Sequence, residues 1–148
     1  MSAADLETVR RLAAADRGLV VLATTRKDNS VHASVVNAGV LDDPVTGAPS
    51  VGMVIRGDAR KLDYLRRNGR ATVVFRAGWE WVSVEGAVRI IGPDDAAEGF
   101  AAEGLPTLLR DIFIAAGGTH DDFDTYDRVM AEERRAAVLI AATKITGN

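Results

Sequence analysis

Five segments rich in β-branched residues follow one another through the first two thirds of the chain, and short turns join most of them. They predict strands at residues 18–26, 31–41, 50–55, 70–76 and 79–91. A single short helical segment, at 59–68, interrupts the series. A doubly wound parallel sheet needs a helix after nearly every strand, so this order favours an antiparallel barrel.

The remaining segments are helical, apart from the last one. An N-terminal helix is expected at 2–16, with Ser2 as its N-cap and Asp5 three residues later as in a capping box. Further segments predict helices at 94–103, 105–116 and 124–135, followed by a sixth strand at 136–145. With 148 residues, the sequence predicts one mainly β domain over 1–148, with helices packed outside the barrel.

The composition excludes several classes of site. The chain has no cysteine, which rules out disulfides, thiolate nucleophiles and Cys-ligated metals, and two histidines leave little scope for a His-rich metal site. No apolar run reaches the roughly 18 residues of a membrane span, and residues 1–16 lack the apolar core of a signal peptide. We therefore expect a cytoplasmic protein without a metal.

The charge distribution is uneven. Residues 56–76 hold seven of the 18 bases and two of the 21 acids, a net charge of +5, whereas the rest of the chain carries −8. A basic island in an acidic chain indicates a local anionic partner, such as a phosphate or carboxylate, rather than a nucleic acid. Within the island, Arg56, Arg60 and Lys61 lie between a strand and a helix N-terminus, where free backbone N–H groups favour an anion. We read Arg66, Arg67 and Arg70 as a solvated helix face.

Two predicted strands carry polar or aromatic side chains on a face that is not purely apolar. On the second strand, His32, Ser34 and Val36 share a face. On the fifth, Trp79 and Trp81 stand opposite the apolar face, so they indicate a subunit interface, a surface flanking a planar ring, or both. The chain has no nucleotide-binding glycine motif, nucleophile elbow or complete EF-hand spacing.

Four stretches together resemble the split-barrel proteins related to pyridoxamine 5′-phosphate oxidase. They are residues 31–47, the Arg60-Lys61-Leu62 segment continuing to 67, the run from Phe75 through Gly78-Trp79-Glu80-Trp81-Val82 to Gly86, and 132–139. More narrowly, the chain is similar to the branch that uses the deazaflavin coenzyme F420 and is known chiefly from actinobacteria. It lacks the C-terminal Arg and Trp pattern of true pyridoxamine phosphate oxidases, which argues against that substrate.

The resemblance implies a homodimer of six-stranded antiparallel split β-barrels, with the cofactor in a groove between the subunits. The phosphate-bearing tail would meet Arg56, Arg60 and Lys61, and the ring would lie against the second strand. The partner subunit would close the groove. The residues implied for contact with the ring are His32, Ser34, Val36 and Asn37. Those implied for closing the partner's groove are Trp79, Trp81 and the terminus from Lys144 to Asn148.

The implied function is an F420-dependent reductase that transfers a hydride to a conjugated small molecule such as a quinone, enone or tetrapyrrole. No catalytic residue stands out; His32, Lys144 or water could deliver the proton. Two alternatives stay open, an FMN-binding oxidoreductase of the same fold and a non-catalytic F420 carrier. A dimeric domain that binds no flavin-like ligand is a third.

Overall fold

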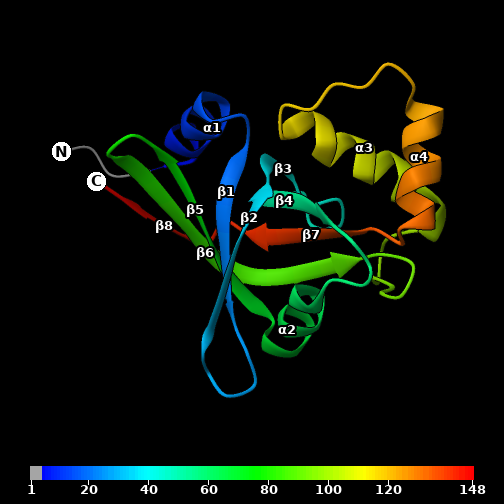
Figure 1. Ribbon diagram of the computed structural model, residues 1–148, viewed down its shortest axis with the longest axis horizontal. Helices are drawn as coiled ribbons and strands as arrows, with labels where there is room; N and C mark the ends of the chain where they lie inside the picture. The colour runs from blue at the N-terminus through cyan, green and yellow to red at the C-terminus, as the bar shows by residue number, and fades with distance from the viewer. Residues whose placement is uncertain (1–4) are drawn as a thin grey trace.

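The computed structural model describes residues 5–148 (Figure 1). Within this range every strand pairing is antiparallel, in the order β2-β1-β5-β6-β7-β4-β3, and β8 pairs with the free side of β6. The strands are β1 (Leu19–Thr25), β2 (Val31–Asn37), β3 (Gly39–Asp42), β4 (Pro49–Ile55), β5 (Arg70–Ala77), β6 (Glu80–Ile91), β7 (Ala136–Ala141) and β8 (Lys144–Gly147).

The long strand β6 belongs to both halves of the barrel. Its first part pairs with β5 and β8, and its second part, from Val88 to Ile91, pairs with β7. The end strands β2 and β3 do not pair with each other among the described residues, so the barrel is split. The mainly β, antiparallel split-barrel class is confirmed.

Four α-helices surround the strands, α1 (Leu6–Ala15), α2 (Arg60–Asn68), α3 (Leu105–Ala115) and α4 (Phe123–Glu132). In the view of Figure 1, α3 and α4 lie together on one side of the strands and α2 lies on the opposite side. No helix of residues 5–148 is long and apolar enough to cross a membrane.

Alternating strand residues build the main core inside the barrel. Phe75, Val82 and Met53 are fully buried there, and Leu62 and Leu65 of α2 join them. Each such side chain contributes about 1.5–3 kcal/mol by its burial. A second apolar cluster, which includes Leu109, Ile112 and Tyr126, packs α3 and α4 against the other face of β7. These helices are therefore fixed to the barrel rather than loosely appended.

Two of the six expected strands are each divided in two. The segment expected as one strand at 31–41 breaks at Ala38 into β2 and β3, which belong to different halves of the barrel. A Cβ on the next residue, Gly39, would lie 2.3 Å from the carbonyl carbon of Ala115, so the chain crosses between the halves where only glycine fits against α3. The segment at 136–145 likewise divides into β7 and β8.

The helix expected at 94–103 is wrong; the structure has a 3₁₀ turn at Ala102–Gly104 and irregular backbone before it. Asp95 forms a bridge with Gly92 and accepts two hydrogen bonds from Arg66, and Asp94 pairs with Arg134. These carboxylates thus hold tertiary contacts instead of starting a helix. The first helix begins at Leu6 with Asp5 as its N-cap, and Ser2 lies outside the described residues.

Candidate functional site

The edge strand β2 presents a half-buried polar face next to α2. His32, Ser34 and Val36 are half-buried, whereas Val31 and Val35, on the opposite face of the strand, are exposed. Within the described residues β2 pairs only with β1, so the backbone N–H and C=O groups along its other edge are free of strand partners. A ligand placed along this edge could use both the side chains and the backbone.

Lys61 reaches this face from the first turn of α2. Its Nζ donates a hydrogen bond to Ser34 Oγ at 2.9 Å. No carboxylate among residues 5–148 pairs with it, and desolvation by burial lowers the pKa of its ammonium. A half-buried cation without a counterion provides a favourable position for an anion. The helix N-terminus adds to this field, because Ala59 at the N-cap has no side chain to satisfy the free N–H groups.

The surroundings of Arg60 and Arg56 differ from those of Lys61. Arg60 is exposed and forms no ion pair within residues 5–148. Arg56 turns to another hollow, of about 360 Å³, where it pairs with Asp58 at 3.3 Å and Glu133 at 3.6 Å. The structure therefore brings Lys61 to β2 and surrounds Arg56 with acids.

One aromatic neighbour was missed by sequence reasoning. The ring of Tyr64 lies 5.4 Å from that of His32, and the guanidinium carbon of Arg26 lies 5.8 Å from the Tyr64 ring centroid. Tyr64 follows Lys61 by three residues, which places both on one face of α2. That spacing was visible in the sequence and could have identified Tyr64.

Val36 and Asn37, at the far end of β2, line a groove of about 390 Å³ that we call the β2–α3 groove. Asn37 also donates from Nδ2 to the Arg17 carbonyl at 3.0 Å. The opposite wall comes from the two C-terminal helices and the residue before β7. The groove residues are Val35, Val36, Asn37, Val54, Ile112, Phe113, Ala116, Tyr126, Met130 and Arg135. Local sequence patterns carry no signal for this wall, because it forms only when α3 and α4 pack together.

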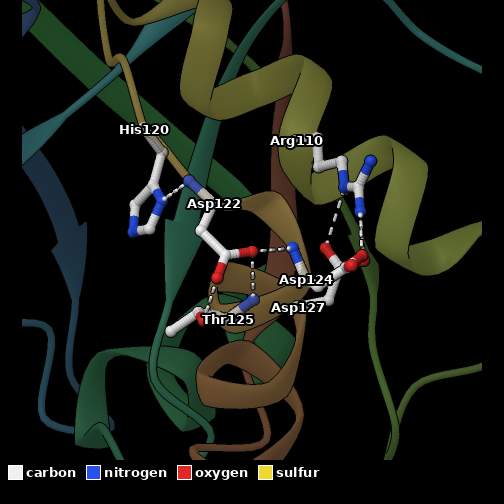
Figure 2. A network of polar contacts seen from close by, with 6 residues as sticks. All are labelled: Arg110, His120, Asp122, Asp124, Thr125 and Asp127. Atoms are coloured by element: carbon white, nitrogen blue, oxygen red, sulfur yellow. Dashed lines mark hydrogen bonds and ion pairs between the residues drawn. The ribbon is translucent and has the colours of Figure 1, made fainter.

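Polar contacts at the start of α4 hold that wall in place (Figure 2). The carboxylate of Asp122 caps the helix by accepting from the backbone N–H groups of Asp124 and Thr125. Arg110 of α3 forms a two-pronged contact with Asp127 of α4, at 2.9 and 2.6 Å. The cap thus fixes the start of α4, and the ion pair joins α3 to α4.

The remaining predicted residues lie at the other edge of this half of the barrel. Asn148 donates from Nδ2 to the Trp79 carbonyl at 2.7 Å and accepts from the Trp81 backbone N–H at 2.9 Å. Trp79, in the turn between β5 and β6, is 94% exposed, and Lys144 is exposed in β8. Three strands separate β8 from β2, so within one chain β8 lies roughly 19 Å from β2 when measured along the curved sheet.

The outer face of β2 and β1 exposes apolar side chains, and on β5 and β6 the same face also carries Arg76, Ser83 and Glu85. Val35 is 66% exposed and Val31 62%, and the register places Val21 opposite Val35 on one side and Val74 on the other. Trp81 extends this outer sheet face along β6. Among residues 5–148 no group of acidic and histidine side chains is arranged to hold a metal ion.

These features define an antiparallel split-barrel protein with a polar edge strand and a groove between the barrel and two helices. The family model described as Pyridoxamine 5′-phosphate oxidase matches residues 7–142 of the sequence. The chain therefore belongs to this family of flavin-binding oxidoreductases. The comparison with curated proteins finds no match.

Several solved structures share the fold. A conserved hypothetical protein from Mycobacterium tuberculosis is 18% identical, with a TM-score of 0.67, over 99% of this chain and 85% of that one. An F420 reductase is 13% identical, with a TM-score of 0.57, over 86% and 88%. An FMN-binding, pyridoxamine 5′-phosphate oxidase-related protein from Nostoc punctiforme PCC 73102 is 11% identical, with a TM-score of 0.66, over 96% and 80%. At these identities the likeness concerns the fold alone.

Proposed function

We propose that this protein is an F420-dependent reductase that transfers a hydride to a conjugated small molecule such as a quinone, enone or tetrapyrrole. The observation that carries the proposal is the half-buried Lys61 ammonium, which has a serine hydroxyl beside it and no carboxylate partner among residues 5–148. A phosphate at that place would complete its hydrogen bonds and supply the missing charge. The exposed Arg60 is the second cation available to the same anion.

The rest of the cofactor would follow β2. From Ser34 to Asn37 the strand advances roughly 10 Å, so a cofactor held at Lys61 can extend along the free edge toward the β2–α3 groove. His32, Ser34, Val36 and Asn37 would contact it there. Arg56 would add only to the wider field, because Asp58 and Glu133 already pair with it.

The chemistry divides between cofactor and protein. When bound, the deazaflavin supplies a hydride from the central carbon of its ring. The protein's part is to anchor the phosphate with Lys61 and Arg60 and to align the ring with the edge of β2. It also holds the acceptor in the β2–α3 groove, away from water. A proton then comes from His32, Lys144 or water.

A second copy of the chain is part of this proposal. The outer sheet face exposes Val31, Val35 and Val21 without a covering helix, and a matching face on another copy would bury them. In such a homodimer Trp79, Trp81 and the segment from Lys144 to Asn148 would reach the groove of the partner. We further propose that residues 1–148 act as one cofactor-binding domain and that the protein works in the cytoplasm.

Parallel fluorescence titrations with F420 and FMN test the proposal. We expect binding of F420 with little or no binding of FMN, and weaker binding of F420 by Lys61→Ala. The FMN alternative is supported by the FMN-binding relative in the same fold, and preference for FMN would replace the cofactor in this proposal.

Turnover separates an enzyme from a carrier. An enzyme accelerates the oxidation of reduced F420 by members of a panel of quinones and enones. A carrier binds reduced F420 and leaves every one of those rates unchanged. If neither cofactor binds, the proposed function is wrong.

A further inference from the structure

Arg135 stands at the edge of the β2–α3 groove with most of its hydrogen-bonding capacity unused. Its Nε donates to Glu133 Oε1 at 3.0 Å, and its side chain is three-quarters buried. Within residues 5–148 neither terminal nitrogen of the guanidinium has a partner. Glu133 therefore orients the guanidinium through one N–H and leaves four donors free.

The backbone before Arg135 is held in an uncommon conformation. Arg134 has φ +50°, in the left-handed region that side chains other than glycine rarely adopt. The turn at Gly57 packs against it: the Gly57 N–H donates to the Glu133 carbonyl at 3.1 Å, and a Cβ on Gly57 would lie 2.5 Å from the Arg134 carbonyl oxygen. Asp94 holds the Arg134 side chain on the outside of the turn. This arrangement sets the direction in which Arg135 leaves the backbone.

The neighbouring walls of the groove suit a flat, conjugated ligand. The rings of Phe113 and Tyr126 lie 4.9 Å apart, and the Tyr126 hydroxyl donates to the Leu109 carbonyl at 3.1 Å. That hydrogen bond fixes the Tyr126 ring and leaves the hydroxyl with no proton to donate to a ligand. Met130 adds a polarisable thioether to the same wall. Arg135 is thus the only cationic side chain of the described residues that lines this groove.

We infer that Arg135 binds the carbonyl oxygen of a conjugated acceptor in the β2–α3 groove and stabilises the negative charge that this oxygen gains during hydride transfer. The inference rests on the proposed function, because that function supplies the hydride. The stabilisation of the negative charge rests on Arg135 itself. It names the substrate class more closely: a planar enone or quinone whose carbonyl points toward Arg135, in preference to an isolated alkene.

The step balances for an enone. A hydride from the reduced cofactor forms a C–H bond at the β-carbon, and the electron pair of the C=C bond moves so that the carbonyl oxygen becomes an enolate oxyanion. Water then protonates the α-carbon, which leaves hydroxide, and the C=O bond is restored. The acceptor gains one hydride and one proton, and the cofactor loses the hydride with its two electrons. Fixed donors aimed at the developing oxyanion lower the barrier of the first stage.

A test without cofactor uses 4-nitrophenol, whose absorbance distinguishes phenol from phenolate. We expect the bound probe to ionise about one pH unit lower than the free probe, because a charged donor favours the phenolate. Arg135→Gln should abolish this shift, and Arg135→Lys should keep part of it. The uncharged 4-nitroanisole should bind the parent and Arg135→Gln within about twofold.

The site of binding is checked in the same experiment. The protein has three methionines, and the methyl resonance of Met130 should move with 4-nitroanisole while that of the buried Met53 stays still. Lys61→Ala and the exposed Arg128→Gln should both retain the ionisation shift, which separates Arg135 from other cations. A shift that survives in Arg135→Gln, or its absence in the parent protein, overturns the inference.

Two further measurements test the inference if Arg135→Gln does not fold or if the proposed function is wrong. A crystal structure of the unaltered protein with 4-nitrophenol should place the phenolic oxygen within hydrogen-bond distance of Arg135, and a probe bound elsewhere contradicts us. With the cofactor that binds, Arg135→Gln should lower kcat for enones about a hundredfold with a smaller change in KM. If neither cofactor binds but the ionisation shift is present, the proposed function fails and the role of Arg135 in anion binding stands.

Discussion

Lys61 Nζ lies 2.9 Å from Ser34 Oγ, and this hydrogen bond joins the first turn of α2 to the edge strand β2 across 27 residues of sequence. The contact keeps a cation half-buried without a counterion, beside backbone groups that have no strand partner. Binding of the proposed anionic cofactor would supply a counterion to Lys61 and hydrogen-bond partners to those backbone groups. The first two predictions follow from this pair.

Replacing Lys61 or Arg60 by alanine should weaken cofactor binding by about 1–3 kcal/mol for each charge-assisted hydrogen bond removed, which is roughly 5- to 150-fold in Kd. Fluorescence titration measures the effect. Arg128→Ala removes an exposed cation on α4 and should bind as the parent does. A Lys61→Ala, Arg60→Ala double variant with unchanged Kd would show that the anion site lies elsewhere.

The stability of the cofactor-free protein should depend on pH through Lys61. Desolvation lowers the pKa of Lys61 in the folded state below its ordinary value of 10.5. The folded state therefore binds fewer protons than the unfolded chain between these two values, and the free energy of unfolding rises with pH in that window. The charged, desolvated Lys61 lowers the free energy of unfolding at lower pH, so this free energy should rise in the parent relative to Lys61→Met as the pH approaches 10.5, as urea denaturation at a series of pH values would show. If the difference in the free energy of unfolding between the two proteins does not change with pH, Lys61 is as well solvated in the folded state as in the unfolded state.

Val35→Glu should prevent formation of the proposed dimer. Val35 is 66% exposed in the single chain, so a charge there should not disturb the fold, but it would be buried without a partner in a dimer formed through the outer sheet face. Light scattering after size-exclusion chromatography gives the mass. Ile114→Glu is the matched control, because Ile114 is 54% exposed on α3, away from that face. A parent protein that is already monomeric contradicts the proposed assembly.

Trp79 should act on the groove of the partner rather than on its own. It is 94% exposed, so Trp79→Ala should weaken cofactor binding in the dimer without lowering the unfolding temperature. Mixed dimers of Lys61→Ala and Trp79→Ala protomers test the arrangement. If each site combines Lys61 of one protomer with Trp79 of the other, the mixed dimer contains one intact site and recovers tight binding. If both residues serve the same chain's site, every site in the mixture carries one alteration and nothing is recovered.

Much of the fold and part of the candidate site were predictable from local sequence. The alternation in 31–37 separated the half-buried His32, Ser34 and Val36 from the exposed Val31 and Val35 as the structure has them. The short helix after the third predicted strand was expected at 59–68 and is observed as α2, which places Lys61 in its first turn. These features depend on the periods of strands and helices, which neighbouring residues determine.

Long-range pairing decided the rest. Asp94 and Asp95 looked like the start of a helix, but they contact Arg134 and Arg66, which are 40 and 29 residues away in the chain. Arg56 was expected at the same anion site as Lys61, yet in the folded chain it pairs with Asp58 and, across 77 residues of sequence, with Glu133.

The β2–α3 groove shows the same division. The sequence by itself determined the elements that line it, namely the strand, the two helices and the apolar stripe on each. Only the tertiary structure decided that Phe113, Tyr126 and Arg135 face Val36 and Asn37, because α3 and α4 settle on β7 through contacts between residues distant in sequence. Periodicity is a property of a few adjacent residues, whereas a groove is a property of surfaces that meet only after the chain has folded.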